Sequence, residues 1–383
     1  MPRASNDHGK SPSNVRNLAK RKESKKPTLN YPTGWLRKRR CLLARNVALI
    51  KGDGTGPELT DATLKVLKAV DTEVSFLECD AGFEWWQTHG GSTLIPDSSW
   101  KIIESADACL KGPTTTPAGP DTPRSVAVSI RQRMNLYANI RPVKTFEGTK
   151  RPLGDVELVC VREATEGLYS GIEHRLSKDV AIAFRKITRT QSEKLCRRAF
   201  EEARRRGWKR SYAITKQNIL KETDGLFMDA ARSVHADYSD ISLEEYFIDN
   251  FAQQLIKNPQ RFDKSVVFGT NLFMDIISEE VSGLVASIGC IYSANFGDDY
   301  AMFEPAHGSA PRYKGKDKVN PTATILAGAW MLDYLGEEKK ADAVFEATRE
   351  VIAEGKKVTY DLGGTARLSE MAEAIADRAR KNL

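Results

Sequence analysis

Three arginines are the first residues whose types and spacing indicate chemistry. Arg131 follows a turn rich in hydroxyl groups, KGPTTTP at 111–117, and Arg141 and Arg162 lie in or beside the apolar segments LYANIRP and VELVCVRE. An unpaired guanidinium is costly to bury, whereas its planar fork binds a carboxylate through two hydrogen bonds. The three arginines therefore indicate a site for a small molecule with two or three carboxylates. Solvated surface arginines are the alternative.

An acidic pair further along the chain could bind a metal ion. Asp275 and Glu279 are four residues apart in NLFMDIISEE, a predicted helix that follows a strand, so both side chains share one helix face. Carboxylate oxygens at this spacing can share a hard divalent cation, with Asp249 as an acidic third ligand. A solvated acidic helix face is the alternative interpretation of this pair.

Two glycine-containing segments could contact phosphate groups. The turn GDGTGP at 52–57 lies between a strand and a helix, but Pro57 stands where the dinucleotide-binding pattern G-x-G-x-x-G requires glycine. The polar segment 304–320 supplies backbone amides and cations that could cradle phosphates, and a flexible surface loop is the alternative. Neither segment decides the cofactor by itself.

These segments are positioned by alternating strands and helices. A strand at 46–51 and a helix at 58–70 flank the first turn. Further short strands are expected at 74–79, 108–110, 156–161, 211–215 and 265–268. A helix at 191–206 is expected to begin with a capping box of Thr190 and Glu193 and to end in a solvated run of arginines before Gly207. The alternation predicts an α/β fold with a largely parallel sheet and ligands at strand ends.

Composition excludes several classes of protein. The chain has 383 residues, of which 40% are hydrophobic and 28% charged, as in ordinary globular proteins. No segment approaches the roughly 20 apolar residues of a membrane span. The six cysteines are scattered without a C-x-x-C pattern, which predicts reduced thiols and a cytoplasmic location.

The basic charge is confined to the N-terminus. Residues 1–46 have a net charge of +11 while the whole chain has +7, so the remainder is mildly acidic. Residues 1–45 are expected to be a basic, disordered extension, and a transit peptide to the mitochondrial matrix is the alternative. A protein that binds nucleic acid through this extension is the alternative from a different class. No RNA-binding module or interleaved aromatic pattern accompanies it, so nucleic acid is not the expected partner.

Seven motifs, taken in order, resemble those of the β-decarboxylating dehydrogenases, the family of isocitrate, 3-isopropylmalate, homoisocitrate and tartrate dehydrogenases. They are GDGTGP, KGPTTTP, LYANIRP, VREATEGLYSGIEH, TKQNILKETDGLF, NLFMDIISEE and EPAHGSAP, and the resemblance covers about nine-tenths of the chain. It implies two lobes around a central cleft without the usual dinucleotide fingerprint. Residues 46–138 plus 286–383 are expected to form a large cofactor-binding lobe, and residues 139–285 a small lobe with the dimer interface.

The resemblance also assigns site residues. The substrate carboxylates are expected near Arg131, Arg141, Arg162, Thr116, Ser125 and Asn218. Tyr169 matches the catalytic tyrosine, and Lys216 matches a catalytic lysine that the partner subunit donates. Mg²⁺ or Mn²⁺ is expected between Asp275, Glu279 and Asp249 of the other subunit, although many relatives have aspartate where Glu279 stands. A cation and neighbouring positive charge are expected to lower the pKa values of Tyr169 and Lys216, which are near 10 when unperturbed.

The resemblance favours NADP as the cofactor. Arg312 and Tyr313 follow HGSAP, where NAD-linked relatives usually have aspartate and an apolar residue, and a guanidinium suits a 2′-phosphate. Tyr360 matches a tyrosine of NADP-linked relatives, while Gly363 and Gly364 occupy the region where some of them add an arginine. The expected cofactor-binding residues are His307, Gly308, Ser309, Ala310, Arg312, Tyr313, Asn320 and Tyr360.

The implied activity is the metal-dependent oxidative decarboxylation of a 2-hydroxy-3-carboxy acid by a homodimer with shared active sites. Within the family the chain is most similar to the NADP-dependent isocitrate dehydrogenases, because Ser125 and the NADP signature favour isocitrate, which is converted to 2-oxoglutarate. Ala127 stands where isocitrate-specific members usually have asparagine, so homoisocitrate and 3-isopropylmalate remain alternative substrates.

Overall fold

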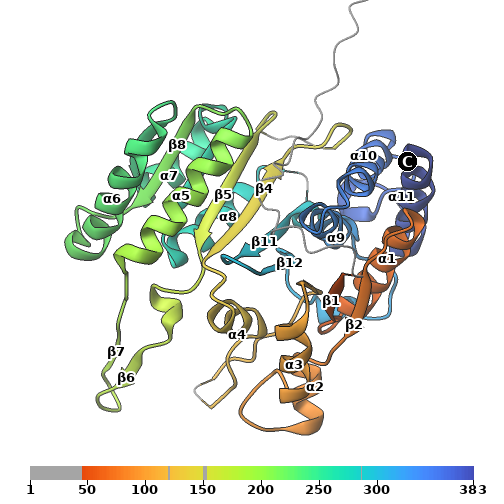
Figure 1. The fold of residues 1–383 in the computed structure, drawn as a ribbon, viewed down its shortest axis with the longest axis horizontal. Helices are drawn as coiled ribbons and strands as arrows, with labels where there is room; N and C mark the ends of the chain where they lie inside the picture. The colour runs from red at the N-terminus through yellow and green to blue at the C-terminus, as the bar shows by residue number, and fades with distance from the viewer. Residues whose placement is uncertain (1–44, 120, 150–152, 286) are drawn as a thin grey trace, which may run out of the picture. The chain divides into compact units, whose positions relative to one another are not determined.

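The computed structural model describes residues 45–119, 121–149, 153–285 and 287–383 (Figure 1). The predictions for residues 1–44, whether disordered extension, transit peptide or nucleic-acid-binding segment, lie outside these ranges. Within them, none of the helices is long and apolar enough to cross a membrane. The described cysteines are free and buried, in agreement with the expectation of reduced thiols: Cys79, Cys109, Cys160, Cys196 and Cys290.

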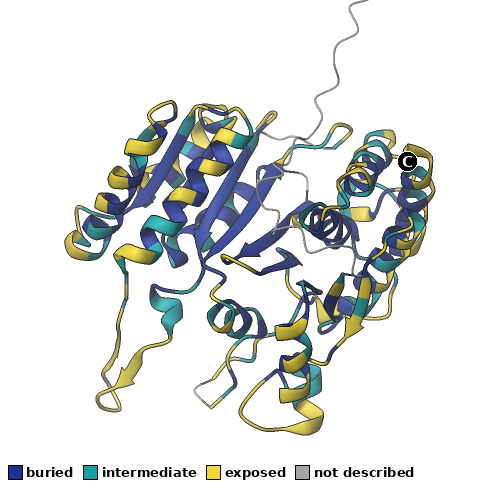
Figure 2. Cartoon of the chain, in the orientation of Figure 1, coloured by how far each residue is buried: buried dark blue, intermediate teal, exposed yellow. Residues whose placement is uncertain are grey.

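One ten-stranded sheet runs through the described part of the chain (Figure 1). Its strands are β1 Asn46–Ile50, β2 Ser75–Glu78, β3 Ala108–Lys111, β4 Ala138–Lys144, β5 Glu157–Glu163, β8 Arg210–Thr215, β9 Ser242–Phe247, β10 Ser265–Gly269, β11 Tyr292–Phe296 and β12 Ala301–Pro305. They lie in the order β2-β1-β3-β12-β11-β4-β5-β10-β8-β9. β6 Glu173–Arg175 and β7 Ala181–Ala183 pair separately as a hairpin, here called the arm, which is exposed along both strands (Figure 2).

Parallel pairing at both ends of the sheet flanks an antiparallel centre. β2, β1, β3 and β12 are parallel, as are β5, β10, β8 and β9, whereas β12, β11, β4 and β5 are successively antiparallel. The prediction of a largely parallel sheet is confirmed, because six of the nine pairings described in this sheet are parallel and only the three at the centre are antiparallel. The connection from β11 to β12 spans only residues 297–300, and so short a loop joins antiparallel strands but not parallel ones.

Helices cover both faces of this sheet, which confirms the predicted α/β class. They are α1 Gly56–Ala69, α2 Phe83–His89, α3 Asp97–Ser105, α4 Val126–Arg133, α5 Arg189–Arg205, α6 Lys221–His235, α7 Ile248–Lys257, α8 Asn271–Ser282, α9 Thr322–Tyr334, α10 Glu338–Glu354 and α11 Leu368–Asn382. Two short 3₁₀ helices bear on the site, η2 Leu168–Ser170 and η6 Pro311–Tyr313. The division into two lobes at the proposed boundaries stays a prediction.

The helix expected at 191–206 begins earlier than its capping signal indicated. α5 starts at Arg189, and the hydroxyl of Thr188 accepts a hydrogen bond from the N–H of Gln191 at 3.4 Å. The predicted capping box of Thr190 and Glu193 is therefore wrong. Thr188 has the extended backbone that an N-cap requires (φ −117°, ψ 148°), whereas Thr190 already lies inside the helix.

The arginine run at the end of α5 is solvated only in part, because Arg204 is exposed as expected but Arg205 and Arg206 are largely buried. The side chains of Arg205 and Arg206 contact Glu202, whose side chain is only 2% exposed. Burial raises the pKa of Glu202, but the charges of the two arginines outweigh this effect and lower it to about 2. Helix α5 therefore ends in a buried group of ion pairs.

The apolar core differs between the two faces of the sheet. On one face a single cluster extends beneath α1, α5, α6, α9, α10 and α11. The other face has two clusters, one beneath α7 and α8 and one beneath α3 and α4. Side chains alternate between the faces along each strand. On β5, for example, Val159 and Val161 enter the single cluster, while Leu158 and Cys160 enter the one beneath α7 and α8.

Buried polar side chains occupy the central strands between those two clusters, and we call them the polar band. They are Lys111 on β3, Asn139 and Arg141 on β4, Arg162 on β5, Asn295 on β11 and Glu304 on β12. Each alternates with a residue of the single cluster, as Ile140 does between Asn139 and Arg141. The polar band therefore faces the side of the sheet that bears α4 and α8.

Candidate active site

The three predicted carboxylate-binding arginines come together from α4, β4 and β5. Arg131, Arg141 and Arg162 are 6%, 6% and 2% exposed, which rules out solvated surface positions. Arg162 lies directly opposite Asn139 in the antiparallel ladder of β4 and β5. Burial and then the nearby charge of Arg131 lower the pKa of Arg162. This concentration of buried positive charge suits a polyanionic ligand.

Asparagine amides orient all three guanidinium groups, and the sequence analysis did not identify them. Arg162 donates through Nε and Nη2 to Asn271 Oδ1 at 3.0 and 2.8 Å. Arg131 Nε donates to Asn295 Oδ1 at 2.8 Å, and Arg141 Nε donates to Asn139 Oδ1 at 2.9 Å. The latter two amides are also joined to each other, because Asn139 Nδ2 donates to Asn295 Oδ1 at 2.9 Å. The available signal was that Asn139 and Arg141 alternate with apolar residues in one strand.

A buried group of ion pairs, which the sequence analysis also did not identify, contacts the guanidinium of Arg131. Glu304 Oε2 lies 2.9 Å from Lys111 Nζ, and Glu304 Oε1 lies 2.9 Å from Arg131 Nη2. Asn295 Nδ2 donates to the same Oε1 at 2.8 Å. Burial raises the pKa of Glu304, but Lys111 and Arg131 outweigh this and hold it well below its usual range. One carboxylate thus faces two cations, and Lys111 joins the candidate ligands for substrate.

Tyr169, Arg162 and Asp275 form one contact group. The Tyr169 hydroxyl donates to Asp275 Oδ2 at 2.5 Å, while Arg162 bonds the other oxygen of Asp275 and lies 4.8 Å from the centre of the Tyr169 ring. Burial and the bond to Asp275 raise the pKa of Tyr169, and the charge of Arg162 opposes them. This direction follows from burial and from the phenol donating to a carboxylate within one chain. The lowering expected from a cation and neighbouring positive charge stays a prediction.

Asp275 and Glu279 share one face of α8, as their spacing predicts. Glu279 Oε1 lies 2.6 Å from Arg141 Nη1, and Asp275 Oδ1 lies 3.7 Å from Arg141 Nη2. Carboxylate oxygens are the donors that Mg²⁺ and Mn²⁺ prefer. Among the described residues, however, no three His, Cys, Asp or Glu side chains are close enough to hold a metal ion together. The donor set fits such an ion only when a second chain, substrate or water completes it.

Lys216 and Asp249 form a separate pair. Lys216 follows β8 and Asp249 lies in the first turn of α7, with 2.6 Å between Nζ and Oδ1. This hydrogen bond lowers the pKa of Asp249. Across the described ranges, no hydrogen bond or ion pair connects the two residues with the arginines of the polar band. The lysine and aspartate that the resemblance assigns to a partner's site are thus bonded to each other.

The loop 304–320 is anchored near its start. The N–H and hydroxyl of Thr55 donate to the Ser309 carbonyl at 2.9 and 3.1 Å, and the hydroxyls of Thr115 and Ser309 are 2.6 Å apart. Gly54 has a left-handed backbone (φ 59°), and a Cβ there would lie 2.3 Å from the Ser309 carbonyl oxygen. Glycine is therefore required at this position. The GDGTGP turn supports this loop and is not a dinucleotide fingerprint.

Charged residues anchor the middle of the same loop. Lys314 donates to Glu84 on α2 at 2.6 Å, and the N–H of Asp317 donates to Glu58 on α1 at 2.9 Å. Asp317 accepts in turn from the N–H of Ser369 at the start of α11 at 2.8 Å. The loop is thus bonded to three helices, which argues against the flexible-loop interpretation.

His307 and Gly308, two predicted cofactor-binding residues near the start of the loop, leave groups free to contact a ligand. His307 Nε2 is buried and has no hydrogen-bond partner among the described residues, and burial lowers the pKa of the ring. At Gly308 a Cβ would meet nothing within 4 Å. An unpartnered ring nitrogen beside open backbone fits a nucleotide. Asn320 is buried and donates to Asp361 at 2.9 Å.

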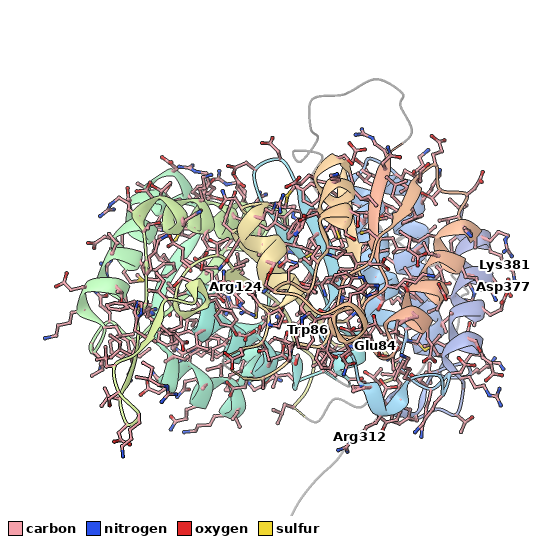
Figure 3. All side chains as sticks on the ribbon, turned by 90° about the horizontal axis from the view of Figure 1, so that it is seen from below. Glu84, Trp86, Arg124, Arg312, Asp377 and Lys381 are labelled. Carbon is pink, nitrogen blue, oxygen red and sulfur yellow. The ribbon has the colours of Figure 1, made fainter. Side chains whose placement is uncertain are left out.

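Aromatic rings and cations gather around the middle of the loop, near Tyr313. The rings of Tyr313 and Tyr360 stack with centroids 6.2 Å apart and 16° between their planes. The Lys318 amine lies 4.9 Å from the centre of the Tyr360 ring, and the Lys316 amine lies 5.9 Å from the centre of the Tyr313 ring. Figure 3 shows Arg312 extending outward from the same loop. None of these three cations forms an ion pair with a described carboxylate, which fits a phosphate ligand.

The remaining predicted site residues make few contacts. Ser125 precedes α4 and its hydroxyl makes no capping bond. Thr116 and Asn218 are exposed, and it is the neighbouring Thr115 that bonds Ser309. Ala310 precedes η6 with a left-handed backbone (φ 42°). The roles given to these residues stay predictions.

The fold and the site together define an α/β protein with a buried, arginine-rich site that suits an anionic ligand. Residues 46–375 match the isocitrate/isopropylmalate dehydrogenase family, to which the chain belongs. It is similar to the 3-isopropylmalate/3-methylmalate dehydrogenase of Methanocaldococcus jannaschii, with 42% identity over 88% of this chain and 99% of that one. It is also similar to the homoisocitrate dehydrogenase of the same organism, with 38% identity over 88% of this chain and 98% of that one. The crystal structure of isocitrate dehydrogenase from Methylococcus capsulatus has a TM-score of 0.84 and 43% identity, covering 88% of this chain and 99% of that one.

The resemblance inferred from the seven motifs is thereby confirmed, as is the fold that it implied. The chain is an oxidoreductase of a family that catalyses oxidative decarboxylation. Relatives named for 3-isopropylmalate, homoisocitrate and isocitrate match it with 42%, 38% and 43% identity. Identity therefore does not distinguish among these substrates, and only the chemistry of the site can favour one of them.

Proposed function

We propose that the protein is an NADP-dependent isocitrate dehydrogenase that converts isocitrate to 2-oxoglutarate and CO₂. The observation that carries the proposal is the set of four buried cations, Lys111, Arg131, Arg141 and Arg162, on or beside the polar band. Isocitrate has three carboxylates, and each can pair with a cation. 3-Isopropylmalate has two carboxylates and an apolar branch. Homoisocitrate, with three carboxylates and one more methylene, is the second candidate because Ala127 leaves room for a longer arm.

Different residues of the chain bind the carboxylates, accept a proton and donate a proton. Arg131, Arg141 and Arg162 hold the carboxylates and so orient the C–H bond that is to be broken. The partner subunit's Lys216, as the neutral amine, would accept the hydroxyl proton, directly or through water. NADP⁺ would accept the hydride, and Asp275, Glu279 and the partner's Asp249 would hold Mg²⁺ or Mn²⁺, which would supply Lewis-acid stabilisation of the substrate oxygens. The resulting β-keto acid loses CO₂, and the Tyr169 hydroxyl protonates the enol carbon.

A homodimer with shared sites is part of the proposal. The pair of Lys216 and Asp249 and the group around Arg162 and Asp275 are two half-sites within one chain, and a second copy would complete each. Many of the exposed large apolar side chains belong to the arm, to the segments that carry Lys216 and Asp249, or to α8, as expected of an interface. They are Ile172, Leu176, Val180, Ile182, Phe184, Ile219, Phe247, Ile256 and Ile276.

The preference for NADP is supported by the cations Arg312, Lys316 and Lys318 beside the stacked rings of Tyr313 and Tyr360. A 2′-phosphate gains charge-assisted bonds from such groups. The two lysines also offer positive charge in place of the arginine that is absent at Gly363 and Gly364.

A substrate panel tests the proposal. D-Isocitrate, homoisocitrate, 3-isopropylmalate and tartrate are assayed with NADP⁺ and with NAD⁺, each with Mg²⁺ and with Mn²⁺, and kcat/KM is compared. The highest value is expected for isocitrate with NADP⁺. A higher value for another acid, or for NAD⁺, would overturn the corresponding part of the proposal.

The role of residues 1–45 is tested with the same assay. Full turnover without them, and no affinity for nucleic acid with them, would favour the enzyme over the nucleic-acid-binding alternative. A fluorescent fusion of the full chain distinguishes the proposed cytoplasmic location from the mitochondrial matrix.

A further inference from the structure

Arg185, which lies two residues beyond β7 of the arm, carries a largely buried charge. Its side chain is 14% exposed, and its Nη1 lies 2.6 Å from Asp224 Oδ1 on α6. Its Nη2 donates to the Thr270 hydroxyl at 2.8 Å, and its guanidinium carbon lies 5.1 Å from the centre of the Phe273 ring. Thr270 precedes α8 and Phe273 belongs to it. One guanidinium group thus connects the base of the arm with α6 and α8.

Asp224 is a completely buried carboxylate. Its Oδ2 accepts a hydrogen bond from the main-chain N–H of Lys216 at 2.6 Å. Its Oδ1 receives no directed hydrogen bond from the described residues, so the approach of Arg185 to that oxygen is a charge contact. A buried carboxylate is costly unless it is paired and hydrogen-bonded. Arg185 and the Lys216 amide meet these two requirements.

The main-chain carbonyl of Lys216 is also hydrogen-bonded to the residues that directly precede α6. This carbonyl accepts from the N–H groups of Ile219 and Leu220 at 2.9 and 2.8 Å, and the Asp224 N–H donates to the Leu220 carbonyl at 3.0 Å. The turn at 216–220 is therefore closed by hydrogen bonds on both sides of Lys216. Because the Lys216 side chain starts from this backbone, the placement of Asp224 determines where the amine can reach.

We propose that Arg185 and Asp224 are positioning residues for Lys216. Arg185 neutralises and orients the Asp224 carboxylate, and this carboxylate fixes the backbone from which Lys216 reaches the reacting hydroxyl. The proposal rests on the proposed function, in which Lys216 handles the hydroxyl proton. Because Arg185 stands at the base of the arm, the arm and the catalytic lysine depend on the same buried charge.

A buried ion pair with a purely structural role would stabilise the fold and leave the chemistry unchanged. The chain contains such a pair as a matched control, Glu202 and Arg205 on α5, with side chains 2% and 6% exposed. Helix α5 covers the face of the sheet opposite the polar band. Glu202→Gln is therefore expected to lower stability without affecting turnover.

The kinetic test compares Asp224→Asn and Arg185→Lys with Glu202→Gln in the full-length protein, using isocitrate, NADP⁺ and Mn²⁺. Asp224→Asn and Arg185→Lys are expected to lower kcat by about tenfold or more and to change KM for isocitrate by less than about threefold. Glu202→Gln is expected to keep kcat within about twofold even though its Tm falls. In a Lys216→Ala background, Asp224→Asn should cause no further loss, because it acts through the missing amine. Losses that multiply in that background, or an unchanged kcat in the single variants, would overturn the proposal.

A second measurement does not depend on turnover. Hydrogen exchange followed by mass spectrometry reports on the amide of Lys216 within a peptide that covers 211–220. Both Asp224→Asn and Arg185→Lys are expected to speed its exchange by about tenfold, because a charge-assisted bond is weakened, whereas Glu202→Gln should not. Unchanged exchange would refute the positioning contact. If the unaltered protein oxidised none of the acids, the proposed function would be wrong. The exchange of the Lys216 amide would still show whether Arg185 and Asp224 hold this backbone.

Discussion

The buried carboxylate of Glu202 gives a quantitative prediction about stability and pH. Arg205 and Arg206 lower its pKa from 4.5 to about 2, and its side chain is 2% exposed. A shift of this size corresponds to roughly 3 kcal/mol of folding free energy. Because the folded-state pKa is the lower one, this stability is fully present above pH 4.5 and is lost as the pH falls from there toward 2.

The perturbation is Glu202→Gln, which keeps the shape of the side chain and removes its charge. At neutral pH the variant is expected to unfold with roughly 3 kcal/mol less free energy than the unaltered protein. The difference should shrink as the pH is lowered, because the unaltered protein then gains the proton that the variant does not need. Urea unfolding at several pH values, followed by circular dichroism, measures this difference at each pH. Comparing the two proteins at each pH cancels effects that they share, such as dimer dissociation.

Two outcomes would refute this reasoning. A difference in unfolding free energy that stayed constant between neutral pH and pH 3 would mean that the ionisation of Glu202 is not what stabilises the fold. A variant as stable as the unaltered protein at neutral pH would mean that the attraction of the two arginines only offsets the desolvation of the carboxylate.

Three further predictions concern the site. Tyr169→Phe is expected to lower kcat by about a hundredfold or more while KM for isocitrate changes by less than about threefold, since only the proton donor is lost; unchanged turnover in a steady-state assay would exclude the role of Tyr169. Arg312→Asp is expected to raise KM for NADP⁺ about ten- to hundredfold without raising KM for NAD⁺, because a carboxylate repels the 2′-phosphate; equal effects on both cofactors would contradict this. Asp275→Asn is expected to weaken Mn²⁺ binding by about tenfold or more in calorimetry of the full protein; unaltered affinity would place the metal elsewhere.

The predicted arginines illustrate what the sequence could reveal about the site. Arg141 and Arg162 lie in segments so apolar that the strands had to be buried, and a buried guanidinium needs anionic or polar partners. The partners themselves were not predictable in this way. Asn295 and Glu304 lie more than 150 residues after Arg131 in sequence, and they meet it only because β11 and β12 insert between β3 and β4. Strand order is set by the packing of the whole sheet and leaves no local pattern in the sequence.

The fold shows the same division between local and distant signals. Most strands at the parallel ends were predicted near their observed positions because each is a short apolar run, whereas β9 and β12 were not predicted. The antiparallel centre was missed, because no local pattern in the sequence shows that β12, β11 and β4 pair in this order. The start of α5 was misplaced by two residues because Thr188 and Thr190 are chemically equivalent caps, and only the backbone angles of the folded chain distinguish them.

The unequal packing of the two sheet faces restricts how the site can open and close. A single apolar cluster connects both ends of the sheet on one face, so separating the ends rigidly would break apolar contacts there. On the opposite face, the described side chains of the polar band are hydrophilic. A movement that brought α4 and α8 closer would therefore have to bend the sheet about the continuous cluster, so that its apolar contacts were kept. A ligand with several negative charges would hold the two helices in the closer arrangement, and its departure as a less charged product would release them.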